Sequence, residues 1–106
     1  MAWTLMFHPA AEAEFLDQPA DIQARLERIA GLIQTFGLQH VSTKFAKHLE
    51  GQLWEFRLKG KDGIARALYV TASGQRIIIV RVFAKKTQKT PRKEITLALE
   101  RAEEVT

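Results

Sequence analysis

Cationic side chains that could bind an RNA phosphate recur along three consecutive predicted strands. Successive side chains of a strand point to opposite faces, so residues two apart share a face. Arg57 therefore shares a face of the first strand with Glu55, and Arg66 lies in the second strand. Lys85 and Lys86 follow where the third strand ends. If the three strands pair as an antiparallel meander, we expect the cations Arg57, Arg66, Lys85 and Lys86 to converge on one patch.

This set of side chains fits the cleavage of RNA without a metal. The reaction needs a base for the 2′-hydroxyl, stabilisation of the pentacoordinate phosphate and an acid for the leaving 5′-oxygen. Arg66 is the best candidate for the phosphate, because an arginine inside a strand is costly unless an anion meets it. Glu55 is a candidate base, or it holds Arg57 in place through an ion pair. Lys85 beside Lys86 can act as acid or base if like charges lower its pKa.

Further side chains on or beside the same strands are candidates for RNA binding. An aromatic ring can stack on a base, while guanidinium and ammonium groups contact the phosphates. The predicted RNA-binding residues are Lys59, Arg81, Phe83, Thr87, Lys89 and Arg92. The alternative is that these cations only form a solvated basic surface.

The basic residues are concentrated in one part of the chain. Residues 57–93 contain eleven Lys and Arg residues and one acid, so this stretch carries +10 and the rest carries −6. Charge separated in this way repels itself unless a polyanion or an acidic partner shares the field. We therefore expect nucleic acid, anionic lipid or an acidic protein as a partner.

Composition and spacing exclude several other kinds of site. The 106-residue chain has no cysteine, so it forms neither a disulfide nor a cysteine-based zinc site. His8, His40 and His48 have no second ligand at metal-binding spacing, and few acids lie near the basic patch, so we expect no metal and no other cofactor. The chain lacks the roughly 20-residue apolar run of a membrane span and the pattern of a signal peptide, so we expect a cytoplasmic protein.

Hydrophobic periodicity and turn residues predict the elements that position this patch. The predicted elements are a strand at 3–7, helices at 9–17 and 19–36, strands at 53–59, 64–71 and 75–84, and a helix from about residue 90. Residues 77–80 are apolar on both faces, which predicts a central strand. Thr90 is predicted to cap the last helix, with Pro91 at its first position and Glu94 near its first turn.

These elements predict a single α+β domain over residues 1–106. The expected order is strand–helix–helix–three-stranded antiparallel meander–helix, with the helices packed on one side of a four-stranded sheet. Residues 38–52, which include His40 and His48, are expected to connect the second helix to the meander.

Four motifs in the second half of the chain resemble the RelE/ParE toxin superfamily, and within it the phage-derived HigB-like branch. They are Leu53-Trp54-Glu55-Phe56-Arg57, Asp62-Gly63-Ile64-Ala65-Arg66, Phe83-Ala84-Lys85-Lys86-Thr87 and Thr90-Pro91. They occur in the order and at the spacings typical of that branch. The resemblance is strong over residues 48–105 and extends to the N-terminal helices only by pattern.

The resemblance implies a RelE-like fold and the toxin of a type II toxin–antitoxin pair. It implies a metal-independent endonuclease that cuts messenger RNA, usually on the ribosome, and a helix-turn-helix antitoxin as partner. By position, Arg57 stands where such toxins place a basic strand residue, and Arg66 matches their central strand arginine. Lys86 matches a basic residue after the last strand.

Two departures from RelE leave the general acid and base open. Glu55 fits the HigB-like branch, whereas RelE itself uses a lysine there. RelE also uses a tyrosine near its last helix, where this chain has Thr90, Pro91 and Arg92. The only tyrosine, Tyr69, is expected on the strand face opposite Arg66.

Two other functions stay open at the level of sequence. A ParE-like inhibitor of DNA gyrase would use the same fold without catalysis. A non-catalytic RNA-binding module would bind RNA in a salt-dependent manner and leave it intact. The convergent basic face favours RNA over gyrase. For either toxin, we expect an acidic or amphipathic antitoxin segment to cover the basic patch.

Overall fold

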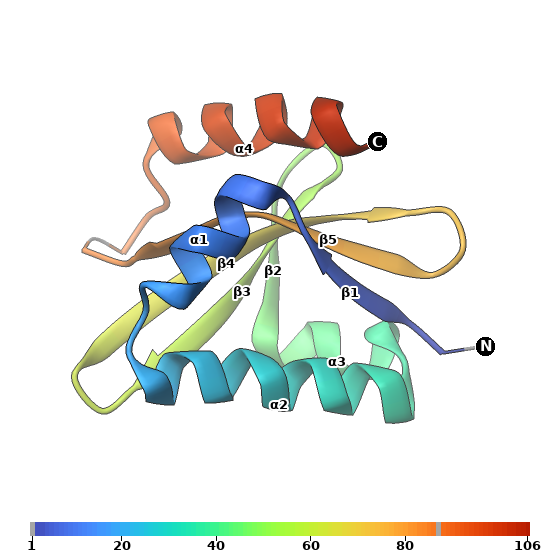
Figure 1. Cartoon of the computed structure of the whole chain (residues 1–106), viewed down its shortest axis with the longest axis horizontal. Helices are drawn as coiled ribbons and strands as arrows, with labels where there is room; N and C mark the ends of the chain where they lie inside the picture. The colour runs from blue at the N-terminus through green and yellow to red at the C-terminus, as the bar shows by residue number, and fades with distance from the viewer. Residues whose placement is uncertain (1, 87) are drawn as a thin grey trace.

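A five-stranded sheet forms the centre of the protein, whose computed structural model describes residues 2–86 and 88–106, with backbone only at 42 and 43. The elements are β1 (Thr4–Phe7), α1 (Pro9–Leu16), α2 (Ala20–Phe36), α3 (Leu38–Phe45), β2 (Ala46–Glu50), β3 (Leu53–Gly60), β4 (Gly63–Ala72), β5 (Arg76–Ala84) and α4 (Arg92–Val105) (Figure 1). The strand order is β1-β5-β4-β3-β2, with β1 parallel to β5 and all other neighbours antiparallel. No helix in the described part of the chain is long and apolar enough to cross a membrane.

The α+β class and the predicted order of elements are confirmed, with two additions between residues 38 and 52. The expected connection contains helix α3 and strand β2, so the sheet has five strands and not the four expected. Strand β2 is a short edge strand whose pairing with β3 is interrupted between His48 and Glu50. Its side chains are mostly polar and only one neighbour pairs with it, which is why hydrophobic alternation did not reveal it.

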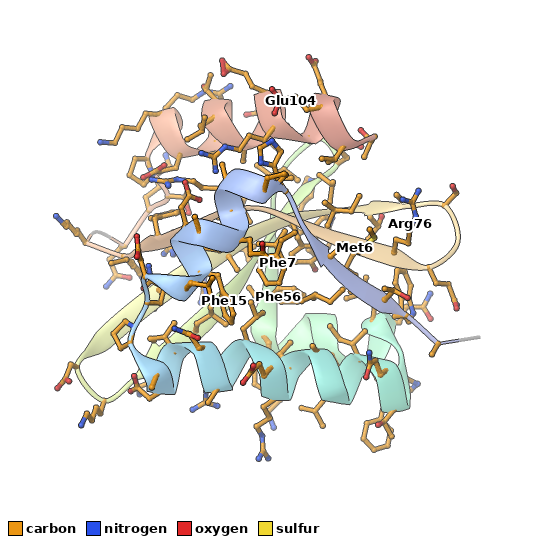
Figure 2. All side chains as sticks on the ribbon, viewed as in Figure 1. Met6, Phe7, Phe15, Phe56, Arg76 and Glu104 are labelled. Carbon is orange, nitrogen blue, oxygen red and sulfur yellow. The ribbon has the colours of Figure 1, made fainter. Side chains whose placement is uncertain are left out.

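Apolar side chains line both faces of the sheet, and helices cover both (Figure 1). Helices α1 to α3 cover one face, where Phe7, Phe15 and Phe56 point toward the middle of the molecule (Figure 2). On the other face, Ala98 and Ala102 of α4 pack in a second apolar cluster over β3, β4 and β5. The expected one-sided packing therefore describes α1 to α3, whereas α4 covers the opposite face.

The central position predicted for β5 is confirmed, because β5 pairs with β1 on one side and β4 on the other. Along this strand, Ile77 and Ile79 belong to the cluster under α1 and α2, and Ile78 and Val80 belong to the cluster under α4. A strand buried on both faces needs apolar residues in an unbroken run.

A β-bulge between β4 and β5 changes which side chains share a face. Leu68 pairs with Arg81, whereas the adjacent Tyr69 pairs with Ile79, so β5 contains one extra residue here. Simple alternation would put Arg81 and Phe83 on the face of Ile79. That expectation is wrong, because the bulge turns both side chains to the face covered by α4.

The β3–β4 hairpin docks closely on the first turn of α2. The backbone N–H of Lys61 donates a hydrogen bond of 2.7 Å to Asp21 Oδ2. A Cβ atom on Gly60 would lie 2.6 Å from that oxygen and 2.8 Å from Ile22 Cδ1. Gly60 therefore leaves room for the side-chain ends of Asp21 and Ile22, which a larger residue would displace.

We expect Gly60→Ala to lower the free energy of unfolding by about 0.5–1.5 kcal/mol, because the added methyl group displaces the Asp21 carboxylate from its hydrogen bond with the Lys61 N–H. Urea denaturation measures this change. Gly31→Ala is the matched control: a Cβ there meets nothing within 4 Å, so alanine in mid-helix should raise stability by about 0.5–1 kcal/mol. Equal stability of Gly60→Ala and the wild type would contradict the close approach.

Candidate RNA-binding and catalytic site

Cross-strand pairing brings the predicted cations together on the sheet face that α4 covers. Arg57 of β3 pairs with Arg66 of β4, and Arg66 pairs with Phe83 of β5. Lys85 continues this group beyond β5, where its backbone N–H donates to the Ile64 carbonyl at 2.7 Å. Pairing of the meander therefore produces the convergence of Arg57, Arg66 and Lys85 that the sequence predicted.

A cavity of about 310 Å³ opens beside this group. Its walls come from β4, β5, the loop after β5 and the first turn of α4. The lining residues are Arg66, Arg81, Phe83, Ala84, Lys85, Lys86, Lys89, Pro91, Lys93 and Glu94. Every charged lining residue except Glu94 is a cation, so the cavity favours an anionic ligand.

Arg66 and Glu55 are buried beside this cavity and contact each other. Their side chains are 2% and 0% exposed, and Arg66 Nη1 lies 3.3 Å from Glu55 Oε1. Arg66 also donates to the Thr90 hydroxyl through Nη1 and to the Gln88 carbonyl through Nη2, the latter at 2.5 Å. The Thr90 hydroxyl in turn donates to Glu55 Oε1 at 2.7 Å. Glu55 is thus in an ion pair, as one interpretation expected, but its partner is Arg66 and not Arg57.

Two polar side-chain atoms of this buried pair could form hydrogen bonds but have no partner in the part of the chain that the structure describes. Within the described residues, neither Arg66 Nε nor Glu55 Oε2 has a hydrogen-bond partner. Burying such atoms without a partner is costly. Because Arg66 also lines the cavity, a ligand that reached its Nε would recover part of this cost.

Lys85 lines the cavity, and its pKa is lowered there. Burial lowers the pKa of Lys85, and the charges of Arg66, Arg57 and Lys47 lower it further, against the opposite effect of Glu55. The responsible cations lie on neighbouring strands, whereas the sequence had pointed to the adjacent Lys86. A lysine with a lowered pKa exchanges protons more readily near neutral pH than an ordinary lysine.

Arg57 and Lys86 are the exposed members of the group. Both side chains are open to solvent, and neither forms an ion pair with a residue that the structure describes. Exposed cations of this kind contact phosphates without sequence preference. The site therefore has an outer pair of available cations and an inner, fixed charge pair.

Arg81 belongs to an ion-pair network that holds α1 and α4 against β5. Its Nε lies 2.7 Å from Glu94 Oε1, and its Nη1 lies 2.6 Å from Glu14 Oε2. Glu14 also accepts hydrogen bonds from Arg101 at 2.9 Å and from the Val82 N–H at 3.1 Å. Burial alone would raise the pKa of Glu14, but these hydrogen bonds and the two arginine charges lower it on balance. Arg81 thus supports the wall of the cavity.

Phe83 and Arg92, both predicted to bind RNA, have protein partners. Phe83 is 9% exposed and packs in the apolar cluster under α4, with its ring centroid 5.6 Å from the Arg81 guanidinium. Its ring is therefore not an open stacking platform in this conformation. Arg92 forms a two-point ion pair with Glu50 of β2.

The remaining predicted RNA-binding residues are dispersed. Lys89 lines the cavity, whereas Lys59 lines a separate groove between the β3–β4 hairpin and α2. Thr87 lies outside the described residues. Tyr69 is on the opposite face of the sheet, as expected, where it stacks on Phe56 with ring centroids 4.1 Å apart. Burial raises the pKa of Tyr69.

The histidines lie away from the cavity. His8 precedes α1 and contacts Glu104 of α4 at 2.5 Å, and His48 of β2 contacts the Gly51 carbonyl at 2.7 Å. His40 is exposed on α3. Within the residues that the structure describes, His, Cys, Asp and Glu side chains form no cluster of three that could hold a metal ion.

Three residues of the site were missed or misassigned in the sequence. Thr90 was predicted to cap α4, and this was wrong: Pro91 occupies the cap position without a side-chain hydrogen bond, and the Thr90 hydroxyl points to Glu55. Lys47 lies opposite Glu55 in the β2–β3 pair, and Lys93 lines the cavity from α4. Recognition of β2 as a strand would have revealed Lys47.

Comparisons with known proteins agree with the resemblance that the four motifs suggested. The model of the family described as phage-derived protein Gp49-like matches residues 13–103. The structure is similar to that of a double arginine-to-alanine mutant of the Escherichia coli toxin RelE in the free state. That match has 15% identity and a TM-score of 0.68, and it covers 95% of this chain and 98% of the other. Among proteins of curated function, none matches the chain in sequence.

We expect Arg57→Gln to raise the pKa of Lys85 toward the ordinary value of 10.5, because the Arg57 charge disfavours the ammonium form. An NMR titration that follows the Lys85 side-chain carbons measures this shift. Arg28→Gln is the matched control, since Arg28 is exposed on α2 and does not contribute to the effect. Equal shifts in both variants would exclude a specific effect of Arg57.

We expect Glu14→Gln to lower the free energy of unfolding at pH 7 by about 1–3 kcal/mol, because charge-assisted hydrogen bonds are lost. The pKa of Glu14 is lower in the folded state than the ordinary value of 4.5. Its contribution is therefore complete above about pH 4.5 and disappears as the pH falls through the folded-state pKa. Denaturation at several pH values measures this loss. Glu27→Gln, at an exposed position of α2, should change stability by less than about 0.5 kcal/mol.

Proposed function

The chain belongs to the family of phage-derived Gp49-like proteins and has the fold of RelE, and from this premise we propose that it is the toxin of a type II toxin–antitoxin pair. We further propose that it cuts messenger RNA on the ribosome without a metal. The observation that supports this activity most directly is the cationic cavity in which Arg66, Lys85 and Lys86 meet. The ribosomal setting is supported by the superfamily resemblance alone.

Each group of the site has a role in the proposed reaction. Arg57 and Lys86 bind the RNA backbone, because both are exposed cations beside the cavity. Lys85 transfers a proton, either from the attacking 2′-hydroxyl or to the leaving 5′-oxygen, since its lowered pKa suits both steps. Arg66 stabilises the charge that develops on the phosphate oxygens. Glu55 is fully buried and bonded, so we assign it the task of holding Arg66 rather than that of a base.

A non-catalytic RNA-binding module is the second candidate function. It is favoured by the internal bonds of Arg66 to Glu55, Thr90 and Gln88, which occupy both of its terminal nitrogens in this conformation. Such a protein would use the outer cations for binding and the inner charge pair only for stability.

For the toxin function, we propose an antitoxin with an acidic or amphipathic segment that covers the cavity and the cations around it. Complementary charge speeds the association of such a pair and selects the partner. By family resemblance, a helix-turn-helix protein is the expected antitoxin.

The test is cleavage of messenger RNA in a translating extract by the wild type and by Lys85→Ala. Loss of a proton-transfer group should lower the cleavage rate by about 10²- to 10⁴-fold with the circular dichroism spectrum unchanged. Arg76→Ala is the control: it removes a cation at the start of β5, where Arg76 bonds the Ser73 carbonyl and does not line the cavity. Arg66→Ala is a poorer test, because it would leave Glu55 buried without a partner and destabilise the fold.

Induction in cells separates the alternatives. The proposed activity predicts that translation stops before DNA supercoiling changes. Loss of supercoiling with intact messenger RNA would instead indicate a gyrase inhibitor. Salt-dependent RNA binding without cleavage, even with ribosomes present, would indicate the RNA-binding module.

A further inference from the structure

Thr90 is placed between the two buried charges of the site. Thr90 is 6% exposed, and its hydroxyl accepts a hydrogen bond from Arg66 Nη1 and donates one to Glu55 Oε1 at 2.7 Å. We infer that Thr90 is a positioning residue, whose hydroxyl sets the orientation of Arg66 and the place of the loop between β5 and α4. Its effect on cleavage rests on the proposed function, whereas the bridge is a property of the free protein.

The chemistry of the position calls for a hydroxyl. A guanidinium only donates hydrogen bonds and a carboxylate only accepts them, so the group between them must accept from one and donate to the other. Threonine and serine do both, and valine, which has nearly the shape of threonine, does neither. The hydroxyl is not used for helix capping, because Pro91 is at the cap position of α4.

The bridge also keeps the two charges apart. Arg66 Nη1 and Glu55 Oε1 are 3.3 Å apart, which exceeds the roughly 2.7–2.9 Å of a direct charge-assisted hydrogen bond. Without the Thr90 hydroxyl, Nη1 keeps only this longer contact with Glu55. We therefore expect the guanidinium to rotate more freely and to lose its fixed direction toward the cavity.

The same contacts fix the loop that carries the cations of the cavity. At one end, the Lys85 N–H is bonded to the Ile64 carbonyl of β4. At the other end, Arg66 holds both the Gln88 carbonyl and the Thr90 hydroxyl. The position of the loop relative to the phosphate site therefore depends on Thr90, even though Thr90 need not contact RNA.

The experiment compares Thr90→Val and Thr90→Ser with the wild type. Thr35→Val is the matched control, because it removes a hydroxyl that bonds only the Gly31 carbonyl on exposed α2. In the free protein, ¹⁵N NMR should show slow rotation of the Arg66 guanidinium in the wild type, in Thr90→Ser and in the control. Thr90→Val should show fast rotation.

Cleavage kinetics give the second measurement. Thr90→Val should lower kcat roughly 10- to 100-fold through misplacement of the reacting groups, with KM and the salt dependence of RNA binding unchanged. Thr90→Ser should recover kcat to within about threefold, since it restores the donor and acceptor. If Thr90→Val does not fold, Thr90→Ala serves as the second variant without the hydroxyl.

Three results would overturn the inference. They are slow guanidinium rotation in the hydroxyl-free variant, wild-type kcat in that variant, and a serine variant as impaired as valine. If the wild type itself cleaves no messenger RNA, the proposed function fails, and the guanidinium measurement alone decides whether Thr90 holds Arg66.

Discussion

The burial of the Arg66–Glu55 charge pair constrains the rest of the structure. Two charges taken out of water destabilise a fold unless their geometry and remaining hydrogen bonds are well satisfied. Here the partners come from distant parts of the chain: Glu55 from β3, Arg66 from β4, and Thr90 and the Gln88 carbonyl from the segment before α4. The strands and the last helix must therefore assemble together before either charge is stabilised, which ties the formation of the site to the formation of the fold.

This constraint divides the cations of the chain by task. Arg66 and Arg81 are bound to carboxylates inside the molecule and keep the walls of the cavity in place. Lys86 is an exposed residue of the cavity wall, and Arg57 is exposed on β3 opposite Arg66. The sequence shows all of them as one basic stretch, and only burial separates cations that support the site from cations available to a ligand. Donors that are preorganised in this way are what the proposed stabilisation of a reacting phosphate would need.

The sequence predicted most of the fold because its hydrophobic periods and turns are strong. Three patterns each indicate a single kind of element: a helix from the apolar stripe of α2, a hairpin turn from Asp62-Gly63, and a central strand from the apolar run Ile77–Val80. Strand β2 was missed because a polar edge strand has no such pattern. Simple alternation puts Arg81 in phase with Ile79 because it does not anticipate the bulge. Pairing of strands also predicted the convergence of Arg57, Arg66 and Lys85. It did not predict which cations are bound internally, since that depends on side chains from other elements.

The bulge in β5 has a consequence for relatives of this chain that differ in length. The extra residue, Val80, adds one apolar side chain under α4, while Arg81 still pairs with Leu68. A relative that lacked this residue would regain regular alternation and keep the counterparts of Arg81 and Phe83 on the same face. Deletion of the residue at the bulge would therefore leave the site intact. A deletion between Phe83 and Thr90 would disrupt it, because the number of residues there determines whether the Thr90 hydroxyl reaches Glu55 of β3 and Arg66 of β4.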